Sequence, residues 1–368
     1  MNQALVDKIV RAVLYEGYVL YPYRPSVKNH HRWTFGGIYP KTYSEANAGA
    51  DGWTMQTQCI VNGGPSAALD VTVRFLHLMA RTVGRMRDSQ TGAQPTFEPV
   101  EALEVGGQSY QSWQEAVERE VKLDSITLGE LAANLRPTKF TLPGRSDSEP
   151  LRDQGGRTVG MLVREQQPIA GAIELSAGKK APDVFLITAR IENHIPFSDD
   201  RAKDRDAALM RALVSTHTIL GVRGGQFVSL TDPAEPLRAF TADCRNVGCW
   251  PVLVGEAGEK DTMLSSPIIL YDYPQIAPES SGDLFDSTEI DEILTLRIMT
   301  LTDEEKRQGA AVDERVRALL DRTEALARER LMDLHGAMRG MRPHIEEAAF
   351  RLGGTQPGAV VPQEEHHA

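Results

Sequence analysis

Cysteine, long apolar runs and clustered positive charge are all scarce in this chain of 368 residues. The three cysteines, Cys59, Cys244 and Cys249, form an odd and sparse set, which excludes a disulfide framework and suits a reducing compartment. No apolar run approaches the length of a membrane span, and residues 1–16 carry charges that the apolar core of a signal peptide lacks. We therefore expect a cytoplasmic protein that does not insert into a membrane.

Positive charge is outweighed by negative charge, and the net charge is −11. This balance argues against nucleic acid as a partner, because phosphate binding requires clustered lysine and arginine. Motifs for nucleophilic catalysis, nucleotide phosphates and catalytic zinc are also missing from the sequence. We expect no cofactor and assign no catalytic residue.

The residues that are present predict an α+β fold with largely antiparallel β domains, helices and a long C-terminal amphipathic helix. Short strands at 158–163, 169–175 and 184–193, separated by turn residues, favour antiparallel pairing. Two further strands are predicted at 53–61 and 70–78, joined by a turn that contains two glycines and a proline.

Helices are predicted where apolar residues recur at helical spacing. The clearest is the C-terminal helix, where Thr302 and Glu305 match a capping box and an apolar stripe continues to Leu334. Its length makes self-association through this helix one expected interaction. The four predicted helices cover residues 2–16, 110–121, 198–220 and 302–342.

Length and composition predict two domains, since domains usually contain about 100 to 200 residues. A stretch rich in proline, glycine, serine and charge forms the predicted linker between them. The expected organisation is an N-terminal α+β domain at 1–141, a linker or flexible loop at 142–157, a β-rich domain with one helix at 158–301, the long helix at 302–342 and a disordered tail at 353–368.

The most distinctive segment runs from Asp261 to Leu296, which contains eight acidic residues and no lysine or arginine. A predicted strand leads there into a loop bounded by prolines, which would present carboxylates. Such carboxylates can dock a basic partner, bind a hard cation, act as acid and base, or simply face solvent. As the partner-binding surface we select Tyr271, Asp272, Tyr273, Glu279, Asp283 and Asp286.

Two further groups carry less specific signals. Cys244 and Cys249 are separated by four residues, but a metal site needs additional ligands, and the alternative is two ordinary buried thiols near a turn. His77 lies on a predicted strand and is expected to be structural. His217 is expected at the end of a helix, where an imidazole complements the helix dipole.

Several long stretches carry a family resemblance. They include residues 215–221 (STHTILG), 225–233 (GQFVSLTDP), the block 265–286 and residues 288–297 (TEIDEILTLR), with weaker support from 21–26 and 33–37. Together they resemble an uncharacterised bacterial protein family associated with [NiFe]-hydrogenase gene clusters. The likeness is strongest from Ile191 to Thr323.

The resemblance implies a genomic context and no catalytic residue. It favours a non-enzymatic accessory protein for [NiFe]-hydrogenase assembly or maturation, which acts by binding a protein partner such as a hydrogenase subunit. Two alternatives stay open: a metal-dependent enzyme that uses carboxylates such as Asp272, Glu279 and Asp283, and a metal-delivery protein that uses Cys244, Cys249 and a histidine.

Overall fold

An antiparallel β sheet organises the part of the chain that the computed structural model describes, namely residues 3–16, 36–87, 96–198, 200, 202–275, 298–299, 301–303, 306–307, 310 and 314–325. Eleven strands share one sheet, and β3 and β4 form a separate hairpin. The strands are β1 (Thr54–Met86), β2 (Phe97–Val100), β3 (Ala102–Val105), β4 (Gln108–Gln111), β5 (Trp113–Thr127), β6 (Arg136–Leu142), β7 (Arg145–Arg152), β8 (Thr158–Gln166), β9 (Ile169–Ala181), β10 (Val184–Asn193), β11 (Val214–Phe227), β12 (Trp250–Leu253) and β13 (Thr262–Ser266).

Strand β1 is the axis of the sheet, and its neighbours change along its length. On one side β10 gives way to β5 at the irregularity between Gly63 and Ala68. On the other side β11 ends opposite Leu76, and β8 begins pairing at Ala80. The predicted turn between two strands is therefore wrong: the chain continues through an irregular stretch of one strand. A Cβ atom on Gly63 would lie 2.9 Å from the Cα of Gly225, so glycine permits this close approach.

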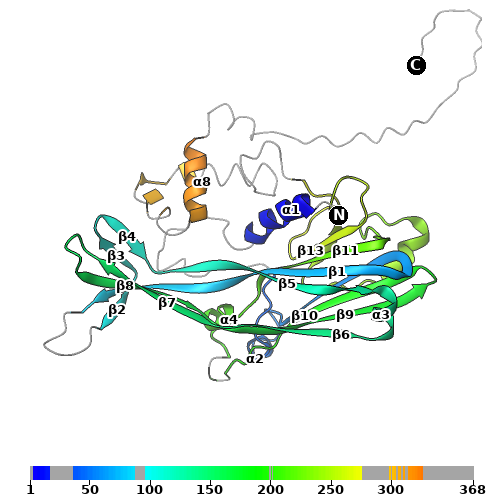
Figure 1. Cartoon of the computed structure of the whole chain (residues 1–368), viewed down its shortest axis with the longest axis horizontal. Helices are drawn as coiled ribbons and strands as arrows, with labels where there is room; N and C mark the ends of the chain where they lie inside the picture. Colours follow the sequence, from blue (N-terminus) through cyan, green and yellow to red (C-terminus); the bar gives the residue numbers. More distant parts are fainter. Residues whose placement is uncertain are drawn as a thin grey trace, which may run out of the picture.

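The first change of neighbours lets the sheet curl over its own core. Figure 1 shows one layer that contains β5, β1, β11 and β13, and a second layer that contains β10, β9 and β6. Phe75 of β1 meets Phe140 of β6 across the gap, with ring centroids 6.3 Å apart. The largest cluster of buried apolar side chains draws on both layers. We call the surface of the first layer that faces away from this core the outer face.

The second change of neighbours produces a distal lobe, seen at the left of Figure 1. There β8 and β2 flank the end of β1, and β7 and the β3–β4 hairpin lie beside them. The lobe has a small core of its own, formed by Val83, Val105, Leu151 and Leu162. Residues 77–79 of β1, between the two neighbours β11 and β8, form what we call the junction.

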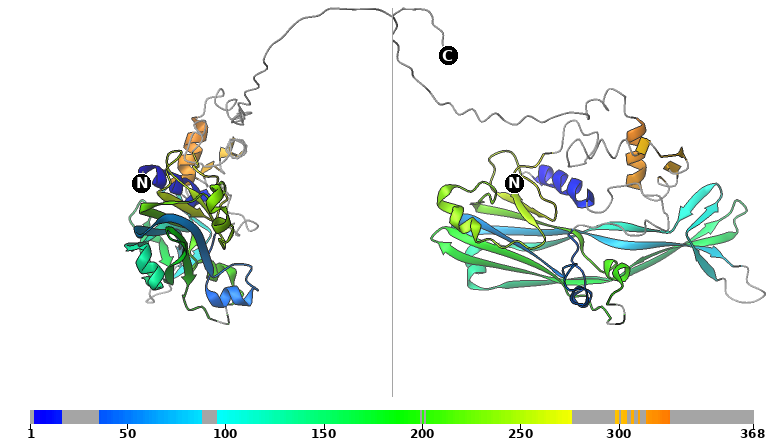
Figure 2. Two further views of the ribbon diagram at one scale, coloured as in Figure 1. Left: turned by 90° about the vertical axis from the view of Figure 1, so that its right-hand side faces the viewer. Right: turned by 180° about the vertical axis from the view of Figure 1, so that it is seen from behind.

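Helix α1 (Gln3–Glu16) lies on the outer face (Figure 2), which confirms the helix predicted at 2–16. Its apolar stripe includes Val6, Ile9 and Val13, which are buried against Ile219 and Leu264 of the sheet. The other helices in the described residues are α2 (Lys41–Ala46), α3 (Leu128–Ala133), α4 (Arg205–Leu209), α5 (Arg238–Ala242), α8 (Glu314–Glu324) and the 3₁₀ turn Glu235–Leu237. None of the helices in these residues is long and apolar enough to cross a membrane.

The predicted α+β class is wrong. Within the part of the chain that the structure describes, strand accounts for 52% of residues and helix for 19%, which is closer to the all-β class, with mostly antiparallel pairing. Two of the predicted helices are in fact strands. Residues 110–121 belong largely to β4 and β5, and the helix predicted at 198–220 is replaced by the short α4 followed by β11.

The long C-terminal helix predicted at 302–342 is also wrong. The described part of this region contains α8, which has 11 residues. Lys306 Nζ lies 3.0 Å from Glu324 Oε1. In one continuous helix these residues would be about 27 Å apart at about 1.5 Å per residue, so no single helix joins them. Glu305 of the predicted capping box and the predicted tail at 353–368 lie outside the described residues.

The segment predicted as a linker, 142–157, contains β7, which pairs along its length with β8. Strands from both sides of this segment share the same sheet, because β1 pairs with β10 and β11. Residues from the two predicted domains therefore build one core. Pro150 and the charged residues of β7 mark an exposed edge strand here, since edge strands carry such residues to resist further pairing.

Candidate functional site

The start of the acidic segment closes one edge of the sheet. In β12, the backbone groups of Pro251 and Leu253 point away from β13, because Val254 N donates to Thr262 O on the β13 side. Pro251 has no N–H to leave unpaired, as expected for an edge strand. Leu253 N donates to Asp272 Oδ1 at 2.8 Å, and Leu253 O accepts from Tyr273 N at 2.8 Å. The chain thus covers its own edge.

Asp272 is held in place by its own chain. Besides the contact with Leu253, its Oδ2 accepts hydrogen bonds from Ser229 Oγ at 2.5 Å and from Thr231 Oγ1 at 2.8 Å. Tyr273 is fixed as well: its hydroxyl donates to Glu259 O at 2.9 Å, and its φ of 57° lies in the left-handed region. Both oxygens of Asp272 are therefore engaged in shaping the fold.

Tyr271, which immediately precedes this anchored pair, is 84% exposed. Two other large apolar side chains near the same edge are exposed, Trp250 at the start of β12 and Ile269. Backbone pairing places the three residues at the same edge. Trp250 pairs with Ser266, which is three residues before Ile269, and Leu253 of the same strand bonds to Asp272, which follows Tyr271. We call Trp250, Ile269 and Tyr271 the edge patch.

The remaining acidic residues of the predicted docking surface, Glu279, Asp283 and Asp286, lie outside the described residues. Of the six residues predicted to bind a partner, the structure thus places three. It brings Tyr271, Asp272 and Tyr273 to the β12 edge, where one is exposed and two are anchored. Trp250 and Ile269 were not selected from the sequence. The only sequence signal for Trp250 is weak: it is an aromatic residue directly before a proline, Pro251.

The two cysteines predicted as a candidate metal site lie in different surroundings. Cys249 is buried in the main core, and its Sγ lies 3.1 Å from Gln56 O and 3.4 Å from Thr57 Oγ1. Cys244 packs instead with Phe240 and Val228 in a separate cluster. Burial raises the pKa of both thiols, to about 11 for Cys244, which disfavours the thiolate that binds metal. Within the described residues, no three histidine, cysteine or acidic side chains are grouped to hold a metal ion.

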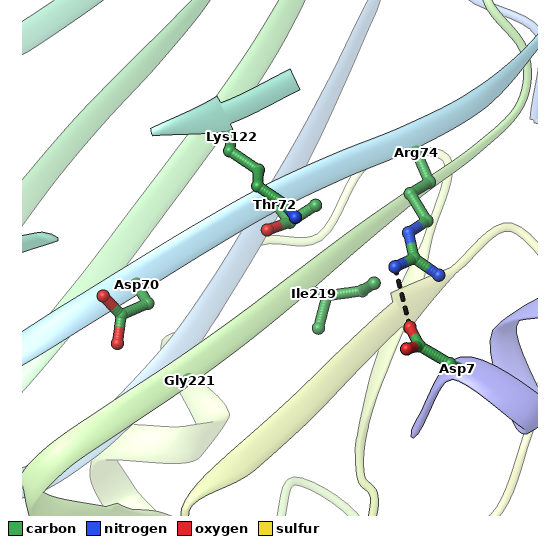
Figure 3. Close-up of a pocket in the computed structure, with 7 residues that line it drawn as sticks. All are labelled: Asp7, Asp70, Thr72, Arg74, Lys122, Ile219 and Gly221. Atoms are coloured by element: carbon green, nitrogen blue, oxygen red, sulfur yellow. Dashed lines mark ion pairs between the residues drawn. The ribbon is translucent and has the colours of Figure 1, made fainter. Parts of the chain in front are cut away.

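A charged hollow lies on the outer face beside α1 (Figure 3). Its volume is about 180 Å³. Asp70, Thr72 and Arg74 alternate along β1 and so point to the same face, with Lys122 of β5 paired opposite Thr72. Asp7, Ile219 and Gly221 complete the lining.

Ion pairs surround the hollow. Arg74 Nη2 lies 2.7 Å from Asp7 Oδ1, and Arg74 Nε lies 2.5 Å from Glu120 Oε2. Lys122 Nζ lies 2.9 Å from the other oxygen of Glu120. At the opposite end, Asp70 Oδ2 pairs with Arg223. This group was not predicted from the sequence, although an acid, a hydroxyl and a base occupy alternate positions of a predicted strand.

His217 lies on the same face but is fully buried in β11, not at the end of a helix as predicted. Its Nδ1 lies 2.7 Å from Ser215 O, and because a carbonyl only accepts, Nδ1 carries the proton. Its Nε2 then accepts from Ser266 Oγ, 3.2 Å away. Burial lowers the pKa of His217 to about 4, so the imidazole is neutral at pH 7.

His77 is buried at the junction, where polar side chains replace the missing strand neighbour. Its Nε2 donates to Gln167 O at 2.7 Å, and Gln166 Nε2 donates to its carbonyl oxygen at 3.2 Å. Arg119 Nη2 donates to Gln166 Oε1 at 2.8 Å. His77 Nδ1 and Arg119 Nε are buried and have no hydrogen-bond partner in the described structure. Burial, together with the charge of Arg119, lowers the pKa of His77 to about 4.

Comparison with known proteins adds no relative to this picture. No protein-family model, curated protein or solved structure matches the chain. The case for a function therefore rests on the residues and on the geometry described above.

Proposed function

We propose that this protein is a non-enzymatic accessory protein that binds a protein partner through the edge patch and the acidic segment at 261–296, which includes Ile269 and Tyr271. In line with the sequence resemblance, the partner is a subunit of a [NiFe]-hydrogenase during its assembly or maturation, in the cytoplasm. The observation that carries the proposal is the exposure of Tyr271 directly before the anchored Asp272 and Tyr273.

An anchored backbone supports binding because it presents Tyr271 without a large loss of conformational freedom on association. Tyrosine and tryptophan are the residues that most often dominate binding energy at protein interfaces. The edge patch offers both, together with Ile269. The absence of lysine and arginine from 261 to 296, with a net charge of −11, favours a partner with a basic surface.

The alternatives have less support from the geometry. A carboxylate-based metal enzyme would need the oxygens of Asp272, which accept three hydrogen bonds from the chain itself. A metal-delivery protein would need Cys244 and Cys249 together, and these thiols belong to different packing clusters. Self-association through the C-terminal helix was expected from a long helix, and the described residues of this region contain α8 with 11 residues.

The test is recovery of hydrogenase subunits by the tagged full-length chain from cells that express the hydrogenase. We expect the unaltered chain to recover the large or the small subunit. The double variant Trp250→Ala/Tyr271→Ala should reduce recovery at least about 30-fold, the loss typical of hot-spot residues. Leu135→Ala is the matched control, since Leu135 is a large apolar residue that is 57% exposed elsewhere on the surface.

Two results together would overturn the proposal: neither subunit is recovered, and hydrogenase activity is unchanged in a strain that lacks this protein. Equal recovery by the double variant and by the control would reject the edge patch as the contact surface. Because both altered side chains are exposed, circular dichroism and thermal unfolding should show the same fold and nearly the same stability for all variants.

A further inference from the structure

The hollow on the outer face contains hydrogen-bonding atoms that the chain does not use. Asp70 pairs through Oδ2 and leaves Oδ1 without a partner in the described structure. Within the described residues, Thr72 Oγ1 and Arg74 Nη1 make no hydrogen bond, and Lys122 Nζ forms an ion pair only with Glu120. These atoms come from three alternate residues of β1 and from Lys122, which is paired opposite the middle one.

The unused atoms are sorted by type along the hollow. The free atom at the Asp70 end is a carboxylate oxygen, which accepts hydrogen bonds and attracts a cation. The free atoms of Lys122 and Arg74 donate hydrogen bonds and attract an anion. The Thr72 hydroxyl can also donate a hydrogen bond. Figure 3 shows Thr72 and Lys122 between Asp70 and Arg74. A ligand that satisfies both ends must carry both charges.

We propose that this hollow binds a small zwitterion of the size of a free amino acid. Its ammonium group contacts Asp70, and its carboxylate contacts Lys122 and Arg74, with a hydrogen bond from Thr72. The site is separate from the edge patch, and the proposal does not depend on the identity of the protein partner.

The dimensions of the hollow agree with such a ligand. Lys122 pairs opposite Thr72 and therefore lies about 7 Å along the strand from Asp70. This spacing suits an amino acid, whose ammonium and carboxylate groups share one carbon atom and can make a hydrogen bond at each end. The volume of about 180 Å³ corresponds to roughly six water molecules at about 30 Å³ each. Ile219 gives the floor an apolar side chain against which a carbon skeleton can pack.

Charge balance also favours a neutral ligand with separated charges. The lining contains two carboxylates, Asp7 and Asp70, and two cations, Arg74 and Lys122. The ion-pair partners Glu120 and Arg223 add one charge of each sign. A free anion would be attracted by Lys122 but repelled by the carboxylates. A free cation would be attracted by the carboxylates but repelled by Lys122 and Arg74. A zwitterion leaves the existing ion pairs intact and satisfies the unused atoms at each end.

The test is isothermal titration calorimetry of the full-length protein with each common amino acid in turn at millimolar concentration. Acetate and methylammonium serve as probes that carry only one of the two charges. We expect at least one amino acid to bind, and both single-charge probes to bind at least about tenfold more weakly, because each forms contacts at one end only.

Two variants locate the binding. Asp70→Asn removes the acceptor charge at one end, and Lys122→Gln removes the donor charge at the other. Each should weaken binding of the amino acid at least about tenfold, whereas Asp70→Asn should not weaken the binding of acetate, because the carboxylate of Asp70 repels this anion. Lys122 is 71% exposed, so its replacement should not disturb the fold.

Matched controls come from the same sheet. Asp124→Asn alters a carboxylate of β5 that is 94% exposed and ion-paired with Arg136, and Lys139→Gln alters an exposed lysine of β6. Both should bind the amino acid as the unaltered protein does. The proposal is overturned if no amino acid binds, if acetate binds as tightly as the amino acid, or if the two site variants bind like the controls.

Discussion

His217 and His77 are both fully buried, yet their surroundings differ in a way that separates two effects of burial. His217 has a hydrogen-bond partner on each ring nitrogen, whereas His77 has one on Nε2 and none in the described structure on Nδ1. The pKa is lowered to about 4 in both, because burial disfavours the charged ring. Loss of solvent therefore sets the charge state, while the hydrogen bonds set what each ring contributes to stability.

The largest expected effect is a shared dependence of stability on pH. Each folded-state pKa of about 4 lies below the value of about 6.5 in an unfolded chain. Between these values the unfolded chain takes up protons that the folded chain does not, so stability falls as the pH falls from about 6.5 to about 4. The loss at pH 4 is about 3 kcal/mol for each histidine. Urea unfolding across this range measures it.

Carboxylates also titrate below pH 5, so the test is a difference between variants. In His77→Phe/His217→Phe, the fall in stability between pH 6.5 and pH 5 should largely disappear. Single variants should lose about half of it each. If the double variant keeps the same pH dependence as the unaltered protein, the two histidines are not the groups that titrate.

The second prediction is that the two histidines contribute unequally to the free energy of unfolding at pH 7. His217→Phe should reduce the free energy of unfolding by about 3 kcal/mol, because it removes two hydrogen bonds and leaves the carbonyl of Ser215 buried without its donor. His77→Phe should cost only about 1 kcal/mol, since it removes one hydrogen bond and also an unpartnered nitrogen. Chemical denaturation at pH 7 gives both values, and equal losses would contradict the comparison.

Asp272 extends the comparison to a carboxylate whose two oxygens are both occupied. Asp272→Ala should lower stability by about 2 kcal/mol, because it removes three hydrogen bonds, although Thr231 can turn to solvent. The neighbouring Tyr271→Ala should leave stability within about 0.5 kcal/mol, as is usual for exposed positions. A large loss for Tyr271→Ala would show that this side chain packs in the fold.

The smallest effect is expected for an ion pair near solvent. Asp7→Asn removes the contact of α1 with Arg74, which retains Glu120 as a partner. Partly exposed ion pairs usually contribute less than about 1 kcal/mol, so we expect a loss of about 0.5 kcal/mol. A loss above about 2 kcal/mol would mean that this pair, more than the apolar stripe, attaches the helix. Thermal unfolding at low and moderate salt separates these outcomes.

The prediction for β11 failed for a definite reason. Residues 214–222 are buried on both faces of the strand, so the alternation that identifies a half-buried strand is absent. Leu213, directly before that run, and Leu220 within it are spaced as on one face of a helix, and the pattern was interpreted as helical. His217 was consequently placed at a helix end, and its buried contacts with Ser215 and Ser266 could not be foreseen.

The prediction for β5 failed because one inward position is polar. Val117, Val121 and Leu123 face inward at alternate positions of the strand, but Arg119 falls between them. With the arginine excluded, the spacing of the two valines matches a helical turn. Arg119 is accepted there because it bonds to Gln166 across the junction, a contact between residues 47 positions apart in the sequence.

The sequence by itself determined the elements whose local pattern of apolar, polar and turn residues is clear. The helix at 2–16, which presents one apolar stripe, and the strands from 158 to 193, which turn residues separate, are examples. Tertiary structure alone decided which strands flank β1, where Asp272 is anchored and how Asp70, Thr72, Arg74 and Lys122 line one hollow. These features depend on contacts between distant residues, and the energy of such contacts is absent from any local pattern.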